Sequence, residues 1–285
     1  MPKANHYYFG RFNLLANYAK NEKKTFLLKG LMSHGTLSVR GSLWGFFKIE
    51  EFVDSELGEF ITGYLAKYVA STDIDVAIPS EHDIGETEVK NAISAQSKFI
   101  LHVESGLIVY HPVGSVIYRE LFCTRFAKIF EEAHQGLMVD AQISAITDRF
   151  EIFKELKKFQ AIGKLSFYLH PSNPDNNDLW DEYDERFKRM RVSSYIEKYE
   201  ADISVPENPG LQLGDDEETT NKIHMAEDGY GVAEAEGVID GKTVIRSTQS
   251  LPVMVRVRSS EDKTLTIMEE IRAKLKDVFA RFLHQ

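Results

Sequence analysis

The chain has 285 residues, 43% of them hydrophobic and 27% charged, which is typical of a globular protein with a buried core. Its single cysteine, Cys123, excludes an intramolecular disulfide framework and any site built from several cysteines, and it fits a reducing cytoplasm. No stretch approaches the roughly 20 apolar residues that span a bilayer, and residues 1–11 lack the apolar run of a signal peptide, so we expect a soluble cytoplasmic protein without membrane contacts.

The formal net charge of -10 is unevenly distributed along the chain. Residues 1–50 carry eight Lys or Arg against two acids, whereas residues 171–240 carry 19 Asp or Glu against six Lys or Arg. The overall charge argues against a general nucleic-acid binder, but a local basic face in the N-terminal segment remains open. Alternatively, the opposite charges are solvated or meet at a subunit contact. The candidate nucleic-acid contacts are Lys20, Lys23, Lys24, Lys29 and Arg40.

The first hundred residues read mainly as strands. The aromatic and apolar run at 7–15 and the β-branched, glycine-punctuated run at 35–52 both predict strands. Apolar residues at helical spacing predict a helix over 57–69, and a short strand is expected at 74–78.

The segment SKFILHVESGLIVYHPV (97–113) predicts a β-hairpin around Ser105-Gly106, because glycine accepts the positive φ of a two-residue turn. If Glu104 pairs with Leu107, the two histidines His102 and His111 lie diagonally across the hairpin. Their Cβ atoms would then be on the order of 7 Å apart, close enough to share a metal ion if a third strand supplied a ligand. Polar residues on a half-exposed sheet face explain them equally well. The pairing also predicts one apolar face, formed by Phe99, Leu101, Val103, Ile108 and Tyr110.

The central region alternates helix and strand patterns. Helices are predicted at 116–133, 148–159 and 179–190, and strands at 137–143 and 164–170. This alternation indicates an α+β fold with a mixed sheet and helices packed against it.

The C-terminal region begins with a linker or long loop at 205–221, where Pro, Gly and a four-acid run break the periodicity. A hairpin pairs 231–237 with 242–248 across Asp240-Gly241, a strand follows at 253–258, and a long amphipathic helix occupies 264–283. We divide the chain into a β-rich basic segment (1–96), a central region (97–204) and a C-terminal region (205–285), forming one or two compact domains.

The usual catalytic motifs are missing: there is no Gly-x-Ser-x-Gly elbow, no phosphate-binding loop and no HExxH. One enzymatic hypothesis uses Asp75 with Glu88 and Lys90, which resemble the core of metal-dependent nucleases of the PD-(D/E)xK type. The carboxylates would hold Mg²⁺, which lowers the pKa of bound water, and the lysine would stabilise the transferring phosphate. Two acids and a lysine on a surface loop match the same pattern by chance.

Two turn clusters carry further candidate residues. Asn173 and Asp175 follow a predicted strand in HPSNPD, where functional loops often occur. Asp228 and Tyr230 lie in DGYG, between a helix and a strand. Both clusters also suit purely structural turns.

Four segments in this order, SKFILHVESGLIVYHP, FYLHPSNPDN, SSYIEKYEAD and EDGYGVAEAEGVIDGKTVIRSTQS, resemble a bacterial family known as domain of unknown function 4747. The order of elements is also loosely similar to phage-exclusion proteins of the lambda RexA sort. The resemblance implies a bacterial or mobile-element setting, compatible with defence against phage. It carries over no catalytic residue.

These observations favour a non-enzymatic recognition or regulatory component of a bacterial anti-phage or mobile-element system. We expect a homodimer, with the C-terminal helix as one candidate contact, that binds nucleic acid or a partner protein of the same operon through its basic N-terminal half. The alternatives are the Mg²⁺-dependent nuclease and an assembly subunit with no ligand of its own. No cofactor is expected, apart from Mg²⁺ in the nuclease hypothesis.

Overall fold

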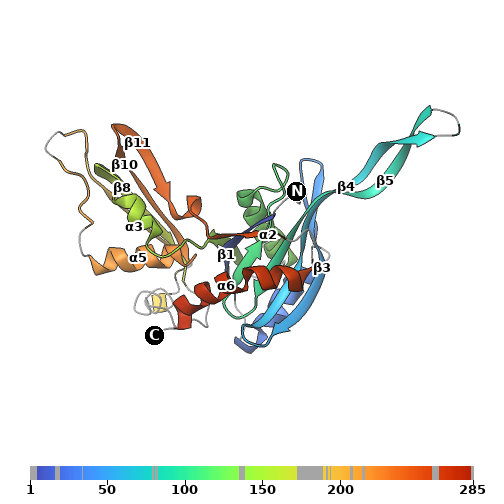
Figure 1. The fold of residues 1–285 in the computed structure, drawn as a ribbon, viewed down its shortest axis with the longest axis horizontal. Helices are drawn as coiled ribbons and strands as arrows, with labels where there is room; N and C mark the ends of the chain where they lie inside the picture. Colours follow the sequence, from blue (N-terminus) through green and yellow to red (C-terminus); the bar gives the residue numbers. More distant parts are fainter. Residues whose placement is uncertain are drawn as a thin grey trace.

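The protein has an α+β fold in which two sheets carry helices on their faces (Figure 1). The computed structural model describes residues 5–16, 20–33, 35–78, 80, 83–134, 139–171, 189–190, 192, 194–205, 208–213, 216–258 and 263–283. The strands are β1 (Asn5–Leu15), β2 (Leu37–Val39), β3 (Ser42–Asp54), β4 (Gly58–Ile78), β5 (Asp83–His102), β6 (Leu107–Tyr110), β7 (Asp140–Ala145), β8 (Ala161–Leu169), β9 (Tyr195–Glu200), β10 (Gly231–Ile239), β11 (Lys242–Ser247) and β12 (Met254–Val257). The helices are η1 (Lys20–Glu22), α1 (Lys23–Met32), α2 (Arg119–Ala133), α3 (Glu151–Leu156), α5 (Glu217–Glu227), η2 (Thr248–Ser250) and α6 (Thr264–Leu283).

The larger sheet has the strand order β12-β1-β6-β5-β4-β3-β2. Strand β1 is long enough to take two partners in tandem along one edge: residues 5–8 pair with β12, and residues 10–15 pair with β7. All described strand pairs are antiparallel, where the sequence suggested a mixed sheet. Five of the ten pairs are formed by strands that follow one another in the chain across a short connection, which makes them antiparallel. The predicted α+β class, with helices packed on sheets and a long C-terminal helix, is confirmed.

Helices cover both faces of the larger sheet. On one face α2 contributes three buried phenylalanines, Phe122, Phe126 and Phe130, and Phe126 lies edge-on to Phe99 of β5. On the other face α6 buries an apolar stripe, whose members are Ile267, Met268, Ile271, Leu275, Val278 and Phe279. Helical spacing predicted Leu265 and Phe282 in place of Ile267 and Phe279, but Leu265 is 72% exposed, and the side chain of Phe282 lies outside the described residues. Among the described residues, no helix is long and apolar enough to cross a membrane.

The predicted helix over 57–69 is wrong, because residues 58–69 form part of strand β4. Within β4, Ile61 and Leu65 join the cluster under α2, whereas Phe60 joins the cluster under α6. A central strand that is covered on both faces carries apolar residues on both sides, so its pattern imitates the spacing of a helix. The strand predicted at 74–78 is the continuation of the same strand.

Beyond the sheet, β4 and β5 continue alone as a two-stranded arm that projects away from the rest of the protein (Figure 1). Strand β3 follows β4 only as far as Tyr68, whereas the β4–β5 pairing runs on from Val69 opposite Ala92 to Ile78 opposite Asp83. No third strand among the described residues supports the arm.

The smaller sheet has the order β11-β10-β8-β9, with β10 and β11 forming the hairpin predicted across Asp240-Gly241. Helix α5 packs on this sheet within the segment predicted to be a linker, so the linker interpretation is wrong for residues 217–221. The Asp216 carboxylate accepts a hydrogen bond from the Thr219 amide at 3.0 Å, and the acids after it suit the positive end of the helix dipole. Asp216, Glu217 and Glu218 therefore form the start of a helix. The helix predicted at 179–190 lies almost entirely outside the described residues.

Candidate functional site

The three residues of the nuclease hypothesis lie on the two-stranded arm. Asp75 is opposite Glu86, and Glu88 is opposite Asp73, so all four carboxylates share one face of the arm. Asp75 and Glu88 are diagonal neighbours, which places their Cα atoms about 7–8 Å apart. Both side chains are exposed, and the Glu88 carboxylate accepts a hydrogen bond from the Ser71 hydroxyl at 2.5 Å.

Lys90, opposite Ser71, is exposed on the same face of the arm. Within the described part of the chain, no group of three or more His, Cys, Asp or Glu could hold a metal ion. The arm therefore presents a solvated acidic face.

The two candidate metal ligands on the β5–β6 hairpin are separated by its register. Leu101 pairs with Ile108, so residues 103–106 form a longer connection than the predicted two-residue turn. His111 consequently lies beside Lys98, four residues along β5 from His102 and on the order of 13 Å away. The structure does not bring the two imidazoles together. The apolar face predicted for this hairpin is confirmed in the cluster under α2.

Each histidine has a structural role instead. His102 is buried between the rings of Phe60 and Phe279, and its Nδ1 accepts a hydrogen bond from the Ser105 amide at 3.2 Å. This burial lowers the pKa of His102 to about 4, so the imidazole is neutral at pH 7. His111 stacks on Tyr7 with 5.2 Å between the ring centroids.

The basic N-terminal residues do not form one free patch. Lys23 is buried, and its ammonium donates a hydrogen bond to the Glu104 carbonyl. Lys24 lies 2.8 Å from the Glu51 carboxylate and 3.2 Å from that of Glu59, and hydrogen bonds to these two acids raise its pKa. Lys29 and Arg40 are exposed, and the side chain of Lys20 lies outside the described residues.

Asp228 and Tyr230 lie in a buried junction between the two sheets. Asp228 is 1% exposed and Tyr230 is 0% exposed. The guanidinium of Arg11 in β1 lies 4.3 Å from the Tyr230 ring centroid, and Asn13 donates to the Gly229 carbonyl at 2.7 Å. These contacts favour the structural interpretation of DGYG. Asn173 and Asp175 lie outside the described residues.

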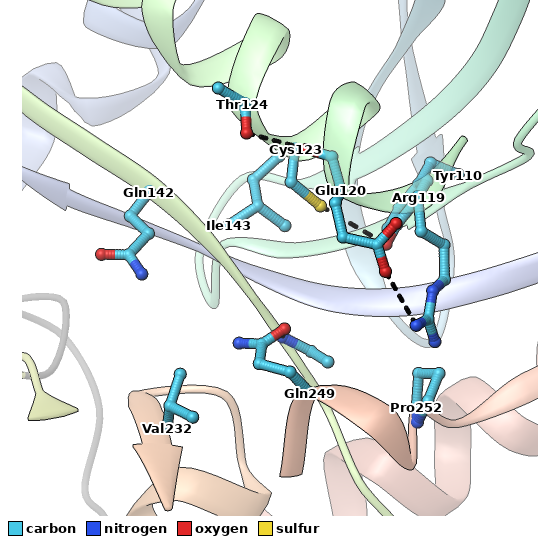
Figure 2. A pocket seen from close by; sticks show the side chains of 11 residues that line it. Tyr110, Arg119, Glu120, Cys123, Thr124, Gln142, Ile143, Val232, Gln249 and Pro252 are labelled. Atoms are coloured by element: carbon cyan, nitrogen blue, oxygen red, sulfur yellow. Dashed lines mark hydrogen bonds and ion pairs between the residues drawn. The ribbon is translucent and has the colours of Figure 1, made fainter. Parts of the chain in front are cut away.

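A groove runs along α2 and β7, and it contains two adjoining cavities of about 300 and 330 Å³. In the first cavity, Glu120, Cys123 and Thr124 come from α2, and Val232, Gln249 and Pro252 lie opposite them (Figure 2). The second cavity extends the groove along the same helix. Both cavities share four lining residues: Cys123, Thr124, Gln142 and Ile143. We define these two cavities together as the α2–β7 groove.

The polar groups at one end of the α2–β7 groove satisfy one another. The Cys123 thiol donates to the Tyr110 hydroxyl at 3.4 Å, and Arg119 pairs with Glu120 at 2.9 Å (Figure 2). Burial raises the pKa of Cys123 to about 12, so this thiol stays protonated and is a poor nucleophile. Burial also raises the pKa of Tyr110 well above its usual range. The groove offers shape and hydrogen bonds rather than an activated nucleophile.

Sequence reasoning missed the α2–β7 groove. Its residues come from β6, α2, β7, β10 and the segment around η2, and the most distant of them, Tyr110 and Pro252, are 142 positions apart in the chain. No local motif marks them, because the groove exists only where β7 takes the outer edge of β1.

A family model described as "Domain of unknown function (DUF4747)" matches residues 5–276 of the chain. No curated protein matches the sequence.

Proposed function

The chain belongs to the DUF4747 family, and we propose that it is a non-enzymatic recognition component of a bacterial anti-phage or mobile-element system that binds a partner protein of the same operon. The observation that carries the proposal is the α2–β7 groove. It combines polar and apolar side chains with a protonated thiol and an internal ion pair, which suits binding rather than bond cleavage.

A protein partner fits the charge distribution better than nucleic acid does. Of the predicted nucleic-acid contacts, Lys23 is buried and Lys24 is neutralised by two acids. The projecting arm carries four carboxylates on one face, which would repel a phosphate backbone. The apolar stripe of α6, a candidate dimer contact, is occupied by the protein's own sheet, so a homodimer would use another surface.

The proposal is tested by binding. The purified protein is mixed with each protein encoded by the neighbouring genes, and complexes are measured by calorimetry or size-exclusion chromatography with light scattering. We expect one of them to bind. Mobility-shift titrations at low salt with single- and double-stranded DNA and RNA run in parallel. Nucleic-acid binding without any protein complex would overturn the choice of partner.

The nuclease hypothesis has its own test. Incubation with Mg²⁺ and plasmid or RNA substrates is expected to show no cleavage above that of the Asp75→Ala/Glu88→Ala variant. Metal-dependent cleavage that this variant abolishes would replace the proposal with the enzymatic function.

A further inference from the structure

Strand β7 has one edge without a partner strand among the described residues. Its inner edge pairs with β1, and in an antiparallel pair every second residue turns its N–H and C=O to the outer edge. The Ala141 amide donates outward to the Glu131 carboxylate at 2.9 Å, and the Ala145 amide donates outward to the Gln249 side chain at 3.4 Å. The same alternation turns the N–H and C=O of Ile143 to this edge.

Ile143 is therefore the open position between two capped ones. No described strand or side chain pairs with its outward backbone groups. Ile143 lines both cavities of the α2–β7 groove, whereas Glu131 lines only the second and Gln249 only the first. The unpaired backbone thus lies along the floor of the groove, with one side-chain cap toward each end.

We propose that the α2–β7 groove binds an extended peptide segment of a partner protein, which adds to the larger sheet as a strand beside β7. Pairing with the Ile143 N–H and C=O supplies two backbone hydrogen bonds, and exchange of the uncharged Gln249 cap for a peptide carbonyl allows a third. From Ala141 to Ala145 the edge spans about 13 Å, the length of four to five extended residues.

The charges in the groove select the chemistry of that segment. Arg119 is paired with Glu120, and the Glu131 carboxylate is occupied by the Ala141 amide. Lys128 on α2 is exposed and makes no ion pair with a described residue, so it is the cation of the groove to which a partner's carboxylate can pair, while the Glu131 carboxylate stays on the Ala141 amide. An acidic residue near Lys128 and a small apolar residue over Cys123 complement the lining. The occupant is an acidic, extended peptide, and this inference rests on the proposed function because it specifies how the partner is held.

The experiment uses the full chain and a display library of random nine-residue linear peptides. We expect enrichment of sequences that carry Asp or Glu at a fixed distance from a small apolar residue. The best peptide is then synthesised with single N-methyl groups at successive positions. N-methylation at every second position removes an N–H that faces β7, so we expect about tenfold weaker binding there and little change at the positions between. Uniform tolerance of N-methylation would overturn strand addition.

Two matched substitutions locate the site. Thr124 is exposed on α2 and lines both cavities, and Thr25 is exposed on α1 and lines neither of them. Thr124→Trp fills the groove and is expected to weaken peptide binding at least about tenfold, whereas Thr25→Trp leaves it unchanged. If the Thr124→Trp and wild-type proteins bind the peptide with equal affinity, and circular dichroism shows that both are folded, the peptide does not bind in the α2–β7 groove.

Failure of this inference is distinguishable from failure of the proposed function. If a neighbouring-gene protein binds equally well to wild-type and Thr124→Trp protein, the proposed function stands and the groove is wrong. In the library selection, peptides that also bind the Thr124→Trp protein are removed. If no remaining peptide binds the wild-type protein, strand addition is also rejected. If the partner binds and Thr124→Trp abolishes the complex, both are supported.

Discussion

Arg11 and Asp228 are 217 positions apart in the sequence, and the Arg11 Nε donates a 2.7 Å hydrogen bond to the Asp228 carbonyl. The same guanidinium donates from Nη1 to the Ser105 carbonyl at 2.8 Å. Because Arg11 is fully buried in β1 and Asp228 precedes β10, this one side chain joins the larger sheet to the smaller one.

Arg11→Met is therefore expected to destabilise the protein by about 3–5 kcal/mol. The substitution keeps much of the side-chain volume but leaves two buried carbonyls without their donor, each at a cost of about 1–3 kcal/mol. Urea denaturation measures the free energy of unfolding. Arg256→Met, at an exposed position of β12, is the matched control and should stay within about 0.5 kcal/mol of the wild type. Equal effects at the two positions would show that Arg11 does not hold the junction.

Gly231→Ala is expected to destabilise the protein by about 3 kcal/mol or more. Gly231 has a φ of 143°, and a Cβ at this position would lie 2.1 Å from the Tyr168 carbonyl oxygen. Gly241→Ala is the control, since its φ is 71° but no atom lies within 4 Å of the added Cβ. The control should lose only about 1–2 kcal/mol, the cost of the left-handed conformation. Thermal denaturation of both variants measures the two losses of stability, and their difference gives the cost of the steric clash at Gly231 beyond that of the backbone conformation.

Stability is expected to fall as the pH is lowered from about 6.5 to about 4. The pKa of His102 is about 4 in the folded protein, below the ordinary value of 6.5, because the ring is buried. The unfolded chain therefore binds the proton more tightly, and the stabilisation present above pH 6.5 is lost as the pH falls, by up to about 3 kcal/mol.

Unfolding free energies of the wild type and His102→Gln, measured at several pH values, test this expectation. The unfolding free energy of the His102→Gln variant should decrease less between pH 6.5 and pH 4 than that of the wild type. His6→Gln, which replaces an exposed imidazole, should retain the wild-type slope. A His102→Gln slope equal to that of the wild type would assign the acid sensitivity to other groups.

Glu86→Lys is expected to stabilise the arm by about 0.2–1 kcal/mol, because it replaces like charges with opposite charges across from Asp75. Hydrogen exchange of the β5 amides measures the gain in protection. The gain should shrink in 1 M salt, where the Debye length is about 3 Å. Thr87→Lys changes the other face of the arm and is the control. Greater protection in Thr87→Lys than in Glu86→Lys would contradict the shared acidic face.

Alkylation of Cys123 is expected to be about 10- to 100-fold slower in the folded than in the unfolded protein at pH 8. With a pKa of about 12, Cys123 is almost entirely protonated at pH 8. The small fraction of thiolate is more nucleophilic than a thiolate of ordinary pKa, which partly offsets the loss. Iodoacetamide labelling followed by mass spectrometry gives both rates. Rapid labelling of the folded protein would show an activated thiol in the groove and would weaken the non-enzymatic proposal.

The sequence by itself determined the elements whose signals are local. The C-terminal helix 264–283 follows from one apolar stripe, and the hairpin at Asp240-Gly241 follows from its turn residues. The apolar face of the 97–113 segment also follows from alternation alone, since its members keep their side even though the register differs from the expected one.

Only the tertiary structure decided what depends on neighbours distant in the chain. Strand β4 packs against a core on each face, so it carries apolar residues on both sides. In the sequence this pattern cannot be distinguished from the apolar spacing of a helix. Lys23 and Lys24 appear in the sequence as two exposed cations. In the fold Lys23 is buried and donates to the Glu104 backbone carbonyl, and Lys24 forms ion pairs with Glu51 and Glu59. The α2–β7 groove likewise depends on long-range pairing. Whether a strand edge is open depends on whether another strand pairs with it, and only the tertiary structure decides that.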